Sequence, residues 1–214
     1  MKQEVQKEWE VLLTNYPQLS GCADDIWAAY ELLKNACRIG GLIMTCGNGG
    51  SAADAGHIVG ELMKSFKLKR PLTGDQREAL VSVFPDEGAY FADHLQRGIR
   101  AISLADQTSF SSAFINDAAP DMVFAQQVFV YGNSGDALWA ISTSGNSINV
   151  VNACKIARAL GVKTIGMTGE HGGKLLKICD VTIRVPACDT FRVQEYHLPV
   201  YHALCAMLEV EMFS

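Results

Sequence analysis

The stretch LIMTCGNGGSAADAGHIVGELMKSF, residues 42–66, contains an apolar run, a glycine turn and a helical pattern in that order. Its first five residues are a short continuous apolar run, and after GNGGS the apolar residues recur at helical spacing. We therefore predict a buried strand, a tight turn and a helix. A strand followed directly by a helix is the repeating unit of parallel α/β sheets.

Four more apolar runs alternate with helical segments after residue 100. They occupy residues 101–104, 137–143, 163–169 and 181–186. Because these runs lack the polar alternation of half-exposed strands, helices should cover both faces of the sheet, and right-handed crossovers then stack the strands side by side. The sequence predicts an α/β fold with a doubly wound open sheet of five parallel strands flanked by helices.

Helical spacing also predicts two N-terminal helices within residues 3–38, interrupted at Tyr16 and Pro17. Later helices are expected over residues 120–131, over 148–160, briefly before the last strand, and from about residue 190. Residues 67–100 are polar and irregular, with one short helix expected near 89–98. No repeat or linker interrupts the chain, so residues 1–214 are expected to form a single domain.

Composition excludes several classes of function. Apolar residues make up 49% of the 214 positions, and 18 Lys and Arg stand against 23 Asp and Glu, so the net charge of −5 does not favour nucleic acid as a partner. The charged, amphipathic start lacks the pattern of a secretory signal, and no apolar run is long enough to span a membrane, so we expect a cytoplasmic protein. The seven cysteines are scattered without a Cys-x-x-Cys pair, which predicts reduced, mostly buried thiols.

Two loops at predicted strand ends have the composition of a phosphate site. The first, Gly47-Asn48-Gly49-Gly50-Ser51, combines glycines with free amides and a residue able to cap a helix. The second, residues 142–147 (STSGNS), places four hydroxyls and a glycine before another helix, a position that favours anions. Each loop alone could be an ordinary turn with an N-cap, but together they predict a phosphate pocket.

Nucleotide binding is not favoured by either of its common signatures. Gly47-x-Gly49-x-x-Ala52 fits a relaxed dinucleotide pattern, but about 20 residues later the chain reads KLKR (67–70) and offers no acidic residue at a strand end. A G-x-x-x-x-G-K-[ST] motif does not occur in the sequence.

Candidate metal or acid-base residues lie on two predicted helices. His57 and Glu61 are four residues apart on one helical face, and Gln194 and His202, eight residues apart, differ by about 80° around the last helix. Both pairs could meet in one cleft, although each residue alone could be a solvated or a core side chain. Pro199 is expected to kink the last helix between Gln194 and His202.

In order, the blocks GNGGSAADAGH (47–57), Glu61, AFIND (113–117), STSGNS (142–147) and RVQEYHLPVYH (192–202) resemble the sugar isomerase (SIS) domain family, and most of all its phosphoheptose isomerases. The resemblance, over about residues 20–212, implies the flavodoxin-like SIS fold and isomerisation of sedoheptulose 7-phosphate to D-glycero-D-manno-heptose 7-phosphate. It also implies a homotetramer with zinc-containing sites between subunits, and residues 1–40 would pack in that oligomer.

The same resemblance assigns roles to single residues by motif position. It implies metal ligation by His57, Glu61, Gln194 and His202, and acid-base work by Glu61 and His202. It implies substrate binding by Asn48, Gly49, Gly50, Ser51, Asn116, Asp117, Ser142, Thr143, Ser144, Ser147 and Gln194.

The chemistry of these residues agrees with isomerisation, which needs a base at carbon and an acid at oxygen to pass through an enediol. A bound zinc ion would polarise the carbonyl, although a metal-bound Glu61 is a weaker base than a free one.

Two alternative functions remain. The chain could be a SIS protein that binds a sugar phosphate or the replication initiator without turnover, or it could be an isomerase of another phosphosugar. The basic segment 65–84 and Pro199 depart from the family pattern; Lys67, Lys69 and Arg70 could reach a phosphate or a neighbouring subunit, with a solvated charged loop as the simpler interpretation.

Overall fold

A computed structural model, which describes residues 2–214, contains one sheet in which every strand pair is parallel. The strand order is β2-β1-β3-β4-β5, as in flavodoxin-like folds. The strands are β1 (Ile43–Cys46), β2 (Ala101–Ser103), β3 (Ala137–Ile141), β4 (Lys163–Thr168) and β5 (Val181–Arg184). The five predicted parallel strands are therefore confirmed.

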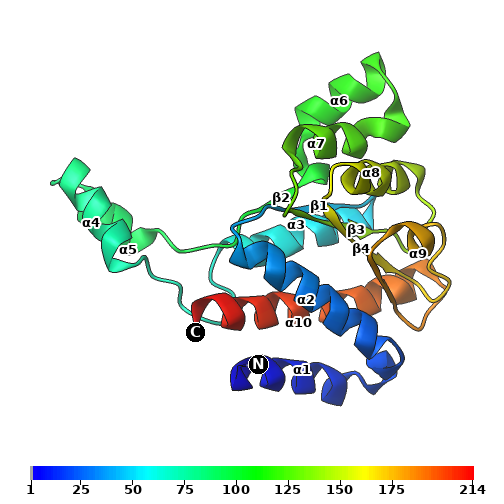
Figure 1. The fold of residues 1–214 in the computed structure, drawn as a ribbon, viewed down its shortest axis with the longest axis horizontal. Helices are drawn as coiled ribbons and strands as arrows, with labels where there is room; N and C mark the ends of the chain where they lie inside the picture. Colours follow the sequence, from blue (N-terminus) through cyan, green and yellow to red (C-terminus); the bar gives the residue numbers. More distant parts are fainter. Residues whose placement is uncertain (1) are drawn as a thin grey trace.

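Helices cover both faces of this sheet (Figure 1). One face is covered by α2 (Ala23–Arg38), α3 (Gly50–Met63) and α10 (Thr190–Phe213), with α1 (Gln3–Asn15) packed outside against α10. The other face is covered by α7 (Val123–Tyr131), α8 (Ile148–Ala159) and α9 (Leu175–Ile178). Alternate residues of one strand enter the two cores, Trp139 the first and Leu138 the second, which explains why the strands are apolar throughout.

The N-terminal helices agree with the prediction, including the interruption after Tyr16, where the 3₁₀ helix η1 (Pro17–Cys22) begins. Their apolar sides pack within the chain, because Val5, Ile26 and Leu33 are fully buried in the first core. That residues 1–40 also pack against other subunits, and that residues 1–214 act as one domain, stay predictions.

Residues 67–100 contain more helix than the sequence analysis predicted. The expected short helix is α5 (Gly88–His94), but α4 (Gly74–Val83) precedes it, and the two form a hairpin that projects from the body of the molecule (Figure 1). A capping box between Thr73 and Gln76 starts α4. The remaining elements are η2 (Leu104–Asp106), α6 (Thr108–Asp117), which was also not predicted, and η3 (Pro120–Met122).

Three further expectations can be compared with the structure. Helix α10 runs through Pro199 as a single helix, so the expected kink does not divide it. Cysteines are mostly buried, as predicted, with Cys188 exposed and Cys179 half-buried. Within residues 2–214, no helix has both the length and the apolar character needed to cross a bilayer.

Candidate functional site

The two loops predicted to form a phosphate pocket lie side by side. Strands β1 and β3 are direct neighbours, with Cys46 paired to Ala140, so their carboxyl ends open onto the same edge of the sheet. Asn48 of the first loop and Asn149 in the first turn of α8 exchange two amide hydrogen bonds of 2.9 Å. The structure therefore brings the glycine loop (residues 47–51) and the serine loop (residues 142–147) together.

The glycine loop is shaped by its backbone. Gly49, which immediately precedes α3, has a φ of +56°. A positive φ of this size favours glycine. A Cβ on Gly50 would lie 2.4 Å from Nε2 of Gln194, so the Gln194 amide rests directly on the first turn of α3. This contact places Gln194 beside Asn48, Gly49 and Gly50, with which it is expected to share a substrate.

In the serine loop the hydroxyls of Ser142 and Ser147 lie 3.0 Å apart, and Ser144 accepts a hydrogen bond of 3.2 Å from the amide of Asn146. Gly145 has a φ of +65°, and a Cβ there would lie 2.1 Å from the carbonyl oxygen of Gly172. The loop thus requires glycine at this position and carries its hydroxyls at the start of α8, where the helix dipole favours an anion.

A second cluster lies further along α3, where that helix packs against α10. Nε2 of His57 is 3.2 Å from Oε1 of Glu61, and the His57 and His202 rings are perpendicular with centroids 5.0 Å apart. Lys64 lies 3.2 Å from the other oxygen of Glu61. Glu61 is largely buried, with 12% of its side chain exposed, so its carboxyl group meets these neighbours more than solvent.

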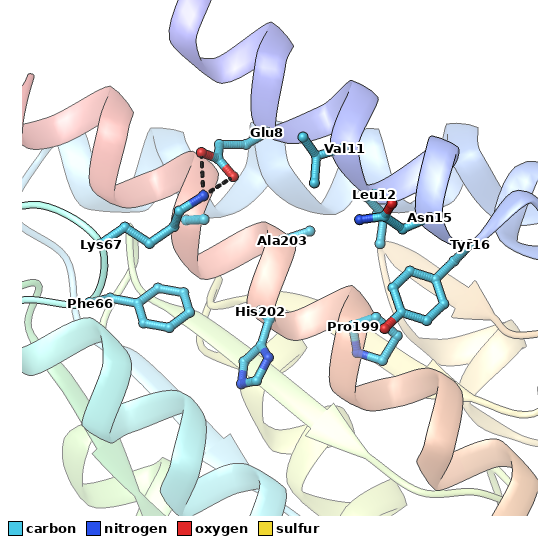
Figure 2. Close-up of a pocket in the computed structure, with 11 residues that line it drawn as sticks. Glu8, Val11, Leu12, Asn15, Tyr16, Phe66, Lys67, Pro199, His202 and Ala203 are labelled. Atoms are coloured by element: carbon cyan, nitrogen blue, oxygen red, sulfur yellow. Dashed lines mark hydrogen bonds and ion pairs between the residues drawn. The ribbon is translucent and has the colours of Figure 1, made fainter.

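His202 is a half-buried donor of this cluster. Its Nε2 atom is buried and has no hydrogen-bond partner among the described residues, and burial, together with the nearby His57, lowers its pKa. The imidazole is therefore neutral at pH 7, the form that accepts a proton or binds a metal. His202 also lines a cavity of about 200 Å³, together with residues of α1 and with Phe66, whose ring centroid lies 5.6 Å from that of His202. Figure 2 shows the residues around this cavity.

Tyr201 and Asp54 support His57 and were not identified from the sequence. The Tyr201 hydroxyl lies 3.0 Å from Nδ1 of His57 and 3.3 Å from Oδ1 of Asp54. Burial raises the pKa of Asp54, and burial and the Asp54 carboxylate raise the pKa of Tyr201. The only signal in the sequence was spacing, because Asp54 lies one turn before His57 and Tyr201 is next to His202.

A buried ion pair anchors the end of α3, and it corrects the interpretation of the basic segment as a solvated loop. Arg70 is fully buried, and its Nε donates to Oε1 of Glu209 at 2.7 Å. The guanidinium also donates to the carbonyl oxygens of Leu62 and Glu61, at 2.7 and 3.1 Å. Lys67 pairs with Glu8 on α1 at 2.6 Å, whereas Lys69 is exposed.

Some candidate residues lie away from the cluster on α3 and α10. Gln194 lies at the first turn of α3, whereas Glu61 lies three turns further along the same helix. Asn116 and Asp117 are exposed at the end of α6, which packs against α7 and η3. A separate group of possible metal ligands, Glu170, His171 and Cys188, lies in the loops after β4 and β5.

Comparison with known proteins identifies the family of this chain. Residues 18–169 match the SIS domain family. The phosphoheptose isomerase of Aliarcobacter butzleri is 42% identical over 86% of this chain and 82% of its own length, and that of Rhodospirillum rubrum is 36% identical over the whole of both chains.

Solved structures give the same result. The phosphoheptose isomerase of Neisseria gonorrhoeae is 32% identical, with a TM-score of 0.70 over 96% of this chain and 91% of that one. The enzyme of Francisella tularensis is 25% identical, with a TM-score of 0.75 over 98% and 100%. From its sequence match, its strand order and these relatives, this chain belongs to the SIS domain family and within it is most similar to the phosphoheptose isomerases.

Proposed function

We propose that this protein is a phosphoheptose isomerase, an aldose-ketose isomerase that converts sedoheptulose 7-phosphate to D-glycero-D-manno-heptose 7-phosphate. Its identity to the isomerase of R. rubrum, 36% over the full length of both chains, supports this activity. The observation that carries the proposal is the convergence of His57, Glu61 and His202 where α3 meets α10. A carboxylate and a neutral imidazole are the groups that an enediol mechanism requires.

In the proposed mechanism Glu61 and His202 share the proton transfers. One of them removes the proton from the carbon next to the carbonyl, and the other protonates the oxygen that becomes a hydroxyl. The lowered pKa of His202 keeps it neutral, so it can accept a proton near pH 7. Lys64, whose amine lies 3.2 Å from Oε2 of Glu61, places a positive charge beside this carboxyl group.

Tyr201 orients His57 in this scheme. The Tyr201 hydroxyl donates to Oδ1 of Asp54 and can accept a hydrogen bond from the Nδ1–H group of His57, 3.0 Å away. That tautomer leaves the lone pair on Nε2 of His57, which faces Glu61, free to bind a metal ion.

The donor set also fits a zinc ion, which we propose as the cofactor. Two imidazoles and a carboxylate are the nitrogen and oxygen ligands that zinc prefers, and the buried Nε2 of His202 has no other partner among the described residues. His57, Glu61 and His202 would hold the ion, with Gln194 as the fourth ligand by its family position. When bound, zinc supplies Lewis-acid polarisation of the substrate carbonyl.

The phosphate and the polyol are assigned to the loops at the carboxyl edge of the sheet. Backbone amides of the glycine loop and the hydroxyls of Ser142, Thr143, Ser144 and Ser147 are proposed to bind the phosphate, because the loops adjoin and precede helices α3 and α8. Ser51, Asn116, Asp117 and Gln194 are proposed as further substrate contacts.

A homotetramer with sites between subunits is part of this proposal. Gln194 and Glu61 lie several turns apart on one chain, a separation that a second subunit can bridge. Val83 and Tyr90 on the projecting hairpin, and Val130 on α7, are each more than 60% exposed and offer apolar surface for such contacts. Seven free cysteines favour the reducing cytoplasm as the location.

The experiment that tests the activity is proton NMR of the zinc-loaded protein with sedoheptulose 7-phosphate in heavy water. We expect an aldose anomeric signal and deuterium at C2, both absent in Glu61→Gln, while calorimetry shows that this variant still binds the sugar phosphate. Glu195→Gln is the matched control, because Glu195 is exposed and pairs only with Arg192 among the described residues, and it should keep full activity.

Two outcomes would contradict the proposal. Binding without turnover or exchange in the wild-type protein would favour a regulatory SIS protein, and turnover of a different phosphosugar alone would change the substrate. Activity retained in Glu61→Gln would remove Glu61 from the proton transfers while leaving the isomerase itself intact.

A further inference from the structure

Three side chains with different donor atoms meet outside the proposed active site, in the loops that follow β4 and β5. The Cys188 sulfur lies 2.8 Å from Oε1 of Glu170 and 3.5 Å from Nε2 of His171. Nε2 of His171 lies 3.7 Å from the same carboxylate oxygen. A thiol, an imidazole and a carboxylate thus point toward one another, although Glu170 and Cys188 are 18 residues apart in the sequence.

The backbone holds these two loops together before any ligand binds. The amide of Glu170 donates to the carbonyl oxygen of Ala187 at 3.0 Å, next to Cys188. Gly172 and Gly173 follow His171 with φ angles of +69° and +55°, so the first loop turns tightly after its donors. The three donors are exposed, and an ion can reach them from solvent.

We propose that Glu170, His171 and Cys188 form a second metal site, which binds a thiophilic divalent cation such as zinc through Oε1, Nε2 and the Cys188 thiolate. Tetrahedral ligands at zinc bond lengths of about 2.0 to 2.3 Å lie about 3.3 to 3.8 Å from one another. The two separations that involve His171 already fall in that range. The shorter contact between Cys188 and Glu170 is a thiol hydrogen bond, which the ion replaces.

Binding at this site is balanced by the release of one proton. The Cys188 thiol, which donates to Glu170, loses its proton to solvent when the sulfur binds the cation as thiolate. The fourth position is left open to water, as in zinc sites with three protein ligands. No oxidation or reduction is involved.

An ion here would also hold the neighbouring serine loop. The amide of Gly169 donates to the carbonyl oxygen of Thr143 at 2.9 Å, and the amide of Leu175 donates to that of Gly145 at 3.1 Å. The amide of Lys174 donates to Oδ1 of Asn146 at 3.1 Å. The ion would join the β4 loop, which makes these contacts, to the loop that leads into α10.

Cobalt titration of the metal-stripped protein distinguishes this site from the one proposed on α3 and α10. A Co²⁺ ion bound to a thiolate gives an intense near-ultraviolet charge-transfer band, and the donors His57, Glu61, Gln194 and His202 include no sulfur. We expect such a band in the wild-type protein and in His57→Ala, and its loss in Cys188→Ser. His171→Ala should weaken Co²⁺ binding by about tenfold or more, since even changes outside the ligand shell reach that size.

Cys179→Ser is the matched control, because Cys179 is half-buried and lies 3.8 Å from Cys154, so this pair of sulfurs is a different place where Co²⁺ could bind a thiolate. This variant should keep the band. Alkylation followed by mass spectrometry gives a second measurement, in which zinc should protect Cys188 from iodoacetamide. Absence of the band at millimolar Co²⁺, or a band that survives Cys188→Ser, would overturn the second site, whatever the result for isomerase activity.

Discussion

The two ends of helix α3 are built in different ways. At its first turn the backbone makes the site, with Gly49 at positive φ and Gly50 leaving room for the Gln194 amide. At its last turns side chains make the site, and Glu61 and His57 are held by residues from α10 and from the segment after α3. The first end depends on glycines, which carry no side chain, and the second end depends on side chains from distant parts of the chain.

This difference decides how each end responds to mutation. A glycine loop is disturbed by an added methyl group, whereas the far end is disturbed when a buried charge loses its partner. Arg70 and Glu209 are 139 residues apart in sequence, and their ion pair joins the end of α3 to the end of α10. We therefore expect the larger loss of stability at the far end.

Glu209→Gln should have the largest effect on stability. Burial alone raises the pKa of Glu209, but the amides of Phe66 and Lys67 and the Arg70 guanidinium hold it below its usual value, so the native carboxylate is charged. Removing that charge leaves Arg70 buried without its counterion, which costs about 3 to 5 kcal/mol. Urea unfolding at pH 7 measures this loss.

Glu195→Gln is the control for that change, because it is the same substitution on the same helix at an exposed residue. Its cost should stay below about 1 kcal/mol. Equal stability losses in the two variants would show that the Arg70 pair does not anchor the end of α3.

Gly145→Ala should cause the next largest effect, in the serine loop that lies beside the first turn of α3. The added Cβ would meet the carbonyl oxygen of Gly172 and would hold an alanine at a φ of +65°. We expect a loss of about 2 kcal/mol or more in unfolding free energy, with weaker sugar-phosphate binding by calorimetry. Gly21→Ala, which faces open space at ordinary φ, should leave both quantities unchanged.

The sequence predicted the first turn of α3 and the serine loop beside it well, because their signals are local. GNGGS and STSGNS follow apolar runs directly, and parallel strand ends share one edge, so their proximity followed from the fold. The pairing of His57 with Glu61 was also predictable, since four residues make one helical turn.

The far end was predicted only in part, because its contacts are long-range. In a charged segment, Arg70 has the same pattern as exposed Lys69, and nothing near it in sequence indicates that Glu209 will meet it. Helix α4 was missed because none of its residues is buried, so it lacks an apolar periodicity. The cluster of Glu170, His171 and Cys188 was not predicted because its contacts are also long-range, since Cys188 lies on a different loop from Glu170 and His171.

His197 lies on α10 between the residues that serve the two ends, and it should make stability depend on pH. Burial lowers its pKa to about 4, whereas the unfolded chain takes up the proton near pH 6.5. Because the unfolded state then binds more protons, stability is full above pH 6.5 and falls as the pH drops toward 4. Between pH 7 and pH 5 this amounts to about 2 kcal/mol.

His197→Gln removes that titration, so its unfolding free energy should change less between pH 7 and pH 5 than that of the wild type. Denaturant unfolding at the two pH values measures the difference, and His94→Gln, at an exposed histidine, should retain the wild-type dependence. An unchanged pH dependence in His197→Gln would mean that the imidazole is solvated in the native state.

Tyr201→Phe should have the smallest effect on stability, but it tests whether the two ends act together. Its hydroxyl contacts two residues of α3: Asp54, which lies one turn after Gly50, and His57, which lies one turn before Glu61. Removing one hydrogen bond costs about 1 kcal/mol, and Tyr196→Phe, with no side-chain hydrogen bond among the described residues, is the control. Nitrogen NMR of His57 reports more directly, because loss of the hydroxyl frees Nδ1 and should shift the tautomer balance. If that balance and the turnover rate stay unchanged, His57 is oriented by Glu61 alone, and the ends of α3 are independent.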